Sequence, residues 1–212
     1  MVAGDDLGAE VCARALAAAG VGRLRLVRHL HQSPLAGEVL RALGASNPDV
    51  AIETVAWPAD SAAWLAVLEG AAAVVRVGFD DDAMLRAAVR LGVPAVVLRG
   101  SADAADVISF RRHGPCPHQN LDVPQQAATE TTVENGPAAV VAAHVASAEV
   151  LAILARATTG EARARHVRVR LGAGNGSDDA SSPSPSPTLA TDIPWTPECF
   201  ACGGTGSEMT FS

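Results

Sequence analysis

The sequence predicts an α/β fold in which a mostly parallel sheet is covered by helices on both faces. Short apolar or alternating runs typical of strands take turns with helical segments through the first hundred residues. This alternation is typical of βαβ units, whose parallel strands need cover on both faces. The 212 residues are enough for one such domain with a core of its own, so no disulfide framework is required.

The expected elements begin with a first strand that ends at Ala3. A short loop then leads to a helix over residues 10–19, which Gly20 and Gly22 bring to an end. The next expected elements are strands over 23–27 and 50–55 with a helix over 34–43 between them, a strand within 71–79, a helix over 82–91 and a strand over 93–98.

After Arg99 the pattern changes, and we expect a loop with little regular structure as far as Asn135. A long helix over 137–157 and a half-exposed strand over 166–171 follow, with the arginines around that strand on a solvated sheet edge. Residues 172–190 are rich in Gly, Ser and Pro and too polar to offset their ordering entropy, which predicts a disordered linker. The expected organisation is a domain over 1–171, this linker, and a tail over 191–212 that packs back on the domain.

Composition excludes several classes of function. Acids outnumber bases 23 to 16, the opposite of what a nucleic-acid backbone would require, so no nucleic-acid partner is expected. All 16 bases are arginine, and the absence of lysine excludes Walker-type phosphate loops and Schiff-base chemistry. The apolar segment 138–155 contains His144, Ser147 and Glu149, which favours a buried helix over a membrane span. No secretory signal follows Met1, so a cytoplasmic location is expected.

Several short motifs occur in an order that resembles one known family. They are Leu7-Gly8, Asn47-Pro48-Asp49, Leu91-Gly92-Val93-Pro94, Gly114-Pro115-Cys116, Gly136-Pro137 and Cys199-Phe200-Ala201-Cys202. Together they are similar to the ubiquitin-activating-enzyme-type adenylyltransferases, whose bacterial members include ThiF, MoeB and HesA. The resemblance implies a Rossmann-like sheet with a split zinc knuckle, Mg-ATP bound at the switch point, and adenylation of a ubiquitin-like protein or peptide carboxylate. It also implies dimers, including pairs of active and inactive halves.

The phosphate loop departs from the family pattern. Glycines are needed there because backbone N–H groups must approach the phosphates closely. With Leu7-Gly8 aligned, Ala3 and Asp5 stand at the first two glycine positions and Asp6 beside them. The degenerate nucleotide site would therefore comprise Gly4, Asp5, Asp6 and Gly8, with two carboxylates that repel the triphosphate.

Other nucleotide-binding positions are also altered. Arg28 follows the second strand, where the family has an acid that holds the ribose hydroxyls. The family's catalytic arginine and lysine are missing, and Leu35 falls where the lysine would be. The acids Asp80, Asp81 and Asp82 either retain the family's magnesium-binding acid or only begin a helix. A further hypothesis joins them to Asp5 and Asp6 at one crevice, which would prefer a hard metal ion or an arginine-rich segment to a nucleotide.

The cysteines suggest a structural zinc site. Cys199 and Cys202 form one pair, while Cys116 has lost its second cysteine and His118 is the expected fourth ligand, with His113 as the other choice. The alternative is a remnant of the site with three free thiols. Cys12 is expected in the core, and His144 is expected to be a buried histidine rather than a ligand.

The function that these observations favour is that of a non-catalytic partner. We expect a family member with a degraded ATP site that works with a paralogue, as a homodimer or heterodimer, or with a peptide-modifying enzyme. The first strand is short, so docking on another subunit would support the sheet. The alternative is an active ATP-dependent adenylyltransferase of a protein or peptide carboxylate. A dinucleotide reductase fits the first loop no better and leaves the Cys-x-x-Cys tail unexplained.

Overall fold

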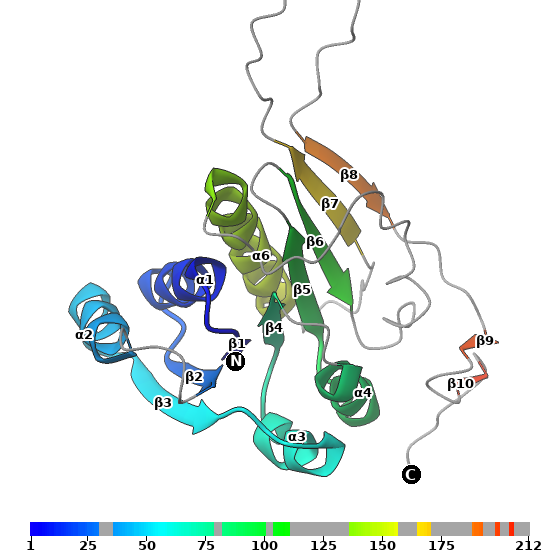
Figure 1. Ribbon diagram of the computed structural model, residues 1–212, viewed down its shortest axis with the longest axis horizontal. Helices are drawn as coiled ribbons and strands as arrows, with labels where there is room; N and C mark the ends of the chain where they lie inside the picture. Colours follow the sequence, from blue (N-terminus) through cyan, green and yellow to red (C-terminus); the bar gives the residue numbers. More distant parts are fainter. Residues whose placement is uncertain are drawn as a thin grey trace, which may run out of the picture.

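The computed structural model describes residues 1–29, 36–78, 82–100, 104–110, 136–156, 165–170, 188–192, 198–199 and 204–205. An eight-stranded sheet in the order β3-β2-β1-β4-β5-β6-β7-β8 forms its centre (Figure 1). The strands are β1 (Val2–Ala3), β2 (Arg23–Arg28), β3 (Ala51–Ala56), β4 (Val74–Val77), β5 (Ala95–Gly100), β6 (Ala104–Phe110), β7 (Arg165–Arg170) and β8 (Thr188–Asp192). The helices are α1 (Leu7–Ala18), α2 (Ala36–Ser46), α3 (Ser61–Leu68), α4 (Asp82–Leu91) and α6 (Pro137–Arg156).

The sheet is mixed, with its parallel part at the N-terminal side. Strands β3, β2, β1, β4 and β5 pair in parallel, and β5 to β8 then pair antiparallel. The short β1 lies between β2 and β4. The chain adds β2 and β3 on one side of β1 and then crosses to add β4 and β5 on the other side. The carboxyl ends of β1, β2 and β3 meet at one edge of the sheet, the place where α/β proteins form their sites.

Helices cover both faces, as predicted. On one face α1, α2 and α6 bury residues such as Leu16, Leu43 and Ala142 against the sheet. On the other, α3 and α4 bury Trp64, Leu68 and Met84. Cys12 joins α1 to α6, since its Sγ donates to the carbonyl of Ala143 at 3.3 Å. Burial raises the pKa of this thiol to about 12, and the predicted core position of Cys12 is confirmed.

Two elements contradict the expected pattern between residues 56 and 110. The loop expected after Arg99 contains β6, whose alternating residues face both layers: Val107 packs toward α6, and Ile108 and Phe110 pack toward α3 and α4. Helix α3 was not predicted, because its eight residues are apolar on nearly every side and lack a helical period. Its start was nevertheless visible in Asp60, whose side chain caps the helix by accepting the N–H of Ala63 at 2.8 Å.

Helix α6 corrects one expectation and confirms another. His144 is exposed rather than buried, since Ala142, Ala143 and Ala146 occupy the face of α6 that meets the core. Among the described residues, Pro137–Ala155 is the one segment long and apolar enough to cross a membrane, with a mean hydropathy of 2.0. Half of that segment is buried, and α6 packs on α1, β5 and β6, as expected for a helix of a protein core.

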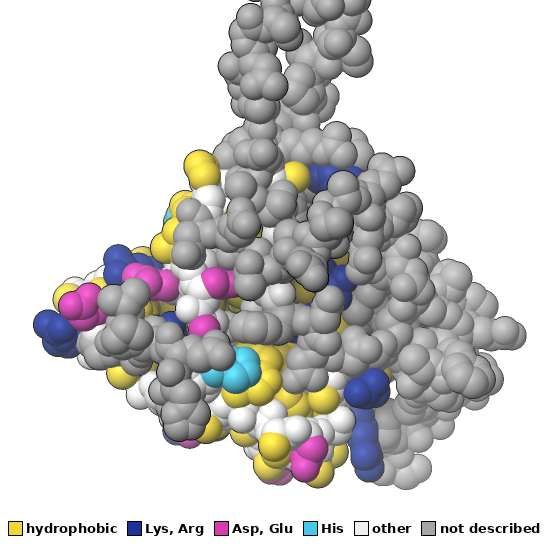
Figure 2. All heavy atoms as spheres, viewed as in Figure 1, with side chains coloured by type: hydrophobic (Ala, Val, Ile, Leu, Met, Phe, Trp, Pro, Cys, Tyr) yellow, Lys and Arg dark blue, Asp and Glu magenta, His cyan; other side chains and the backbone are white. Residues whose placement is uncertain are grey.

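The arginines of β7 do not form a solvated edge, because β7 lies between β6 and β8. Arg165 pairs with Glu149 of α6 at 2.8 Å. Arg168, on the opposite face, donates to Asp106 of β6 from Nε at 2.7 Å and from Nη2 at 3.0 Å, and the ring Nε2 of His166 contacts the same carboxylate at 2.7 Å. Figure 2 shows charges of both signs side by side at the left, over α1 and α2. Within α1, Arg14 pairs with Glu10.

The remaining described segments lie near the C-terminus. β8 begins at Thr188, so the last three residues of the expected linker belong to the sheet, while 171–187 lie outside the described residues. A two-stranded hairpin forms from β9 (Glu198–Cys199) and β10 (Gly204–Thr205).

The contacts of Asp106 with His166 and Arg168 make the free energy of unfolding depend on pH in the acid range. Burial raises the pKa of Asp106, but the hydrogen bonds from His166 and Arg168 outweigh it and lower the pKa from 3.8 to about 2. A depressed carboxyl pKa contributes stability that is present above 3.8 and is lost as pH falls toward 2. We expect Asp106→Asn to cost about 1–2 kcal/mol of unfolding free energy at pH 7 and almost nothing near pH 2, by urea unfolding. Asp49→Asn, at an exposed carboxyl, is the control, and an Asp106→Asn cost that did not shrink in acid would contradict the assignment.

Candidate functional site

The carboxyl ends of three neighbouring strands bring four side chains together. Asp5 follows β1, Arg28 ends β2 and His29 follows it, and Trp57 follows β3. The backbone ties the second and third strands at this level, because the N–H of Trp57 donates to the carbonyl of Arg28 at 2.8 Å. This group of four, the Asp5 cluster, lies at the carboxyl ends of these strands, where the resemblance implies a nucleotide.

Asp5 is the centre of the cluster. Its carboxylate accepts from Nε of Arg28 at 3.3 Å and from the backbone N–H of His29 at 3.0 Å, and it contacts Nδ1 of His29 at 2.7 Å. The side chain is 10% exposed. The Asp5 charge is therefore offset by a guanidinium of the same chain, which the local sequence does not predict.

The ring of His29 is held by an aromatic contact with Trp57, which is itself held by Trp64. The His29 ring stacks on Trp57 with centroids 4.4 Å apart and planes 15° apart, and Trp57 meets Trp64 edge to face at 5.2 Å. The sequence predicts His29 at the mouth of the second strand as an ordinary loop residue and predicts no role for Trp57. The signal that could have found them is their position, because each follows a strand whose carboxyl end faces the switch point.

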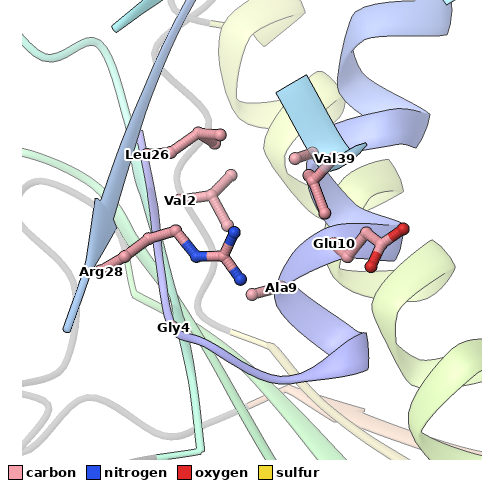
Figure 3. Close-up of a pocket in the computed structure, with 8 residues that line it drawn as sticks. Val2, Gly4, Ala9, Glu10, Leu26, Arg28 and Val39 are labelled. Atoms are coloured by element: carbon pink, nitrogen blue, oxygen red, sulfur yellow. The ribbon is translucent and has the colours of Figure 1, made fainter. Parts of the chain in front are cut away.

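Arg28 extends from β2 toward the start of α1, over Gly4 and toward Ala9 (Figure 3). It is 8% exposed and lines a hollow with Val2, Leu26 and Val39. The free space in this hollow is about 10 Å³, room for about one water molecule. Arg28 thus stands where the family's ribose-binding acid is expected, and it binds an acid of the chain instead.

Asp6 occupies the N-terminus of α1. It is the N-cap residue, with an extended backbone, and its carboxylate accepts the N–H of Ala9 at 2.9 Å. Burial raises the pKa of Asp6 despite this hydrogen bond, and the nearby Asp5 also raises it. A helix N-terminus is a favourable site for a phosphate. Here the carboxylate of Asp6 accepts one of the free N–H groups and lies at the positive end of the helix dipole.

Gly4 and Gly8 let the first loop and α1 lie close to β4. Gly4 has φ +153°, and a Cβ there would stand 3.0 Å from the carbonyl oxygen of Val77. A Cβ on Gly8 would stand 3.0 Å from Cγ1 of Val77 and 3.2 Å from Cδ2 of Leu98. The two glycines are therefore explained by packing, without a bound phosphate.

The other predicted site residues cannot be placed beside this cluster. Asp80, Asp81, Cys116, His118 and Cys202 lie outside the described residues. Cys199 lies in β9, opposite Gly204 of β10. Pairing of β1 with β4 agrees with the topology behind the acidic-crevice hypothesis, but Asp5 and Asp6 each have partners within the chain. Within the described part of the chain, no three His, Cys, Asp or Glu side chains group as they would around a metal ion.

Comparison with solved structures identifies the type of fold. The microcin C7 biosynthetic enzyme MccB, in complex with N-formylated MccA, superposes with a TM-score of 0.70 at 14% identity over 95% of this chain and 66% of that one. Escherichia coli MccB with ATP gives 0.68 at 15% identity, over 95% and 65%. PaaA gives 0.64 at 15% identity, over 91% and 63%. The chain shares the fold of these structures.

This likeness concerns the fold. No family model matches the chain, and no curated protein matches it. The chain spans just under two thirds of the length of PaaA and of MccB in the comparisons above. The expected Rossmann-like architecture is thus supported at the level of the backbone.

Alanine substitutions at Gly8 and Gly44 separate the effect of close packing on stability from the effect of helix propensity. We expect Gly8→Ala to lower the unfolding free energy by about 1–3 kcal/mol, because its Cβ meets Val77 and Leu98. Gly44→Ala, in α2 with nothing within 4 Å of its Cβ, should raise it by about 0.5–1 kcal/mol. Urea unfolding of both variants measures the difference. Equal effects at the two positions would show that α1 does not lie as close to β4 as described.

Proposed function

We propose that this chain is a ThiF-like protein whose nucleotide site is closed by its own side chains and which works as a non-catalytic partner subunit. Its partner would be a family paralogue or another enzyme of a system that modifies a peptide or a sulfur-carrier protein. The observation that carries the proposal is the Asp5 cluster, in which Arg28 and His29 hold the carboxylate at the carboxyl end of β1.

Binding of ATP at this crevice would require several simultaneous rearrangements. The phosphates would have to displace the Asp5 carboxylate from Arg28 and the Asp6 carboxylate from the N–H of Ala9. Both carboxylates would then face an anion in a partly buried space, at a cost of several kcal/mol in the absence of new partners. The ribose would meet a guanidinium, which donates hydrogen bonds but accepts none.

The fold itself supports a role in a peptide-modifying system. MccB is a microcin C7 biosynthetic enzyme that has been solved with N-formylated MccA, and the likeness to it extends over nearly all of this chain. The resemblance includes pairs in which one half is active and the other is not. A chain that keeps the sheet and both helical layers while closing its crevice fits the inactive half of such a pair.

A structural zinc belongs to the same proposal. Its ligands would be Cys199 and Cys202 with Cys116 and His118, all supplied by the protein, which leaves no open position for catalysis. The support is that the Cys-x-x-Cys segment begins in β9 of the β9–β10 hairpin, with Cys199 opposite Gly204. The metal would connect the tail to the loop region before α6.

The alternative is an active ATP-dependent adenylyltransferase. In that case Arg28 would leave Asp5 when ATP arrives and would pair with a phosphate, and Asp5 or one of the acids 80–82 would hold magnesium. The favouring observation is that Arg28 already points toward the start of α1 (Figure 3).

Calorimetric titration with Mg-ATP decides between the two. We expect no binding heat up to millimolar nucleotide for this protein, because the crevice is filled, while E. coli MccB, which has been solved with ATP, should bind under the same conditions. The expected result extends to pyrophosphate exchange, which should stay at background with any peptide.

One-to-one binding that Arg28→Met weakens would overturn the closed-site proposal and support the adenylyltransferase. Binding that Arg28→Met left unchanged would place the nucleotide elsewhere on the protein and would also count against the proposal as stated.

A further inference from the structure

We propose that the outer edge of β3, which no described strand covers, is a self-association surface, on which β3 of a second copy pairs antiparallel about a two-fold axis through Thr54. The proposal stands on the geometry of the edge and holds whether or not the protein binds nucleotide. It would join two eight-stranded sheets into one continuous sheet.

The edge is open in the described part of the molecule. β3 is the last strand of the sheet, and no described element lies beyond it (Figure 1). Its residues are exposed or half-buried throughout. An edge strand presents a row of N–H and C=O groups that can pair with another chain.

The register with β2 determines which groups point outward. The N–H of Ala51 donates to Gly22 at 2.9 Å, and the N–H of Trp57 donates to Arg28 at 2.8 Å. In a parallel pair alternate residues of a strand bond to the neighbour, so residues 51, 53, 55 and 57 face β2. The backbone groups of the intervening residues, Ile52, Thr54 and Ala56, consequently face away from the sheet.

β3 lacks the features that usually protect an edge. Natural edges carry charges, prolines or bulges that prevent pairing. Among the six residues of β3 the one charge is Glu53, whose carboxylate is 48% exposed and accepts from Nε of Arg25 on β2 at 2.9 Å, so the charge is paired within the sheet. Ile52, Thr54 and Val55 are β-branched, which favours further strand pairing.

Charge and backbone direction favour one register among those centred on the middle residues 53–55 of β3. A two-fold axis perpendicular to the sheet pairs residues whose side chains lie on the same face. An axis at Glu53 would place two carboxylates directly opposite at the closest spacing, which is unfavourable. An axis at Val55 would place Pro58, which has no N–H, opposite Ile52. An axis at Thr54 pairs Thr54 with itself, Ile52 with Ala56, and Glu53 with Val55. It brings Pro58 opposite Val50 only, outside β3, where the N–H of Val50 already donates to Asn47 at 3.3 Å.

The Thr54 register explains why a second copy is the favoured occupant. Its hydrogen-bonding pairs are those whose groups face outward, Thr54 with Thr54 and Ile52 with Ala56, so each open group meets another open group. Every contact occurs twice, as in an isologous dimer. An extended peptide would satisfy one edge only, whereas the second copy satisfies two edges at once and brings a strand already ordered.

Sedimentation velocity of the full chain over a range of concentrations, with wild type and Thr54→Pro compared, tests the pairing. Proline removes an outward N–H and leaves the β2 bonds intact, so the variant should fold while its dimer dissociation constant rises on the order of tenfold or more. A wild-type protein that stays monomeric, or a dimer that Thr54→Pro leaves unchanged, would overturn the proposal.

Cysteine substitution tests the register without dependence on proline. In the proposed pairing the Cα atoms of the two Thr54 residues are about 5.5 Å apart, within disulfide range. The two Ala56 residues are separated by four residues along the strand, about 13 Å. Oxidation should therefore cross-link Thr54→Cys well above the wild-type background and should leave Ala56→Cys at that background. Equal yields from both variants, or none from either, would rule out this register and with it the proposal.

Discussion

The carboxylate of Asp5 organises the carboxyl end of the parallel strands. It follows a first strand of two residues, and it reaches the end of β2 through Arg28 and the backbone and ring of His29. His29 in turn stacks on Trp57 after β3, which packs on Trp64 of α3. One acidic side chain thus connects three strands and, through two aromatic rings, a helix of the opposite layer. Arg28 and His29 would lose their common partner without it.

The same loop explains how so short a central strand is held. Gly4 and Gly8 let the chain approach Val77 of β4 without a Cβ in the way, and the Asp6 cap starts α1 immediately afterwards. α1 then packs on α6, with Cys12 between them. In a nucleotide-binding protein of this fold, glycines and a free helix N-terminus serve the phosphates. Here Gly4 and Gly8 serve close packing, and Asp6 bonds to the helix N-terminus. The residues that depart from the nucleotide-binding pattern are thus the ones that hold the loop in place.

Most of the parallel half of the fold could be predicted from sequence, because its strands are apolar runs separated by amphipathic helices. α4 matches its expected range, and β2, β3 and β7 deviate by one residue at their ends. β6 was missed because Asp106 interrupts its apolar pattern, and that acid is explained only by Arg168 and His166, about sixty residues away. The site was predicted in part: Asp5, Asp6 and Arg28 were identified as departures from a nucleotide-binding pattern. That Arg28 neutralises Asp5, and that His29 and Trp57 complete the cluster, depends on strand order, which no local pattern contains.

The central claim, that the pair of Asp5 and Arg28 replaces a ligand in closing this crevice, is tested most directly by a double-mutant cycle on stability. Asp5→Asn, Arg28→Met and the double variant would be unfolded in urea at neutral pH. The account predicts that the two substitutions are coupled by about 1–3 kcal/mol, with the double variant more stable than the single effects sum to, because each single variant leaves a buried polar group without its partner. Additive effects within about 0.5 kcal/mol would contradict it. In that case the contact would contribute nothing to the fold, and the crevice would be free to open for a nucleotide.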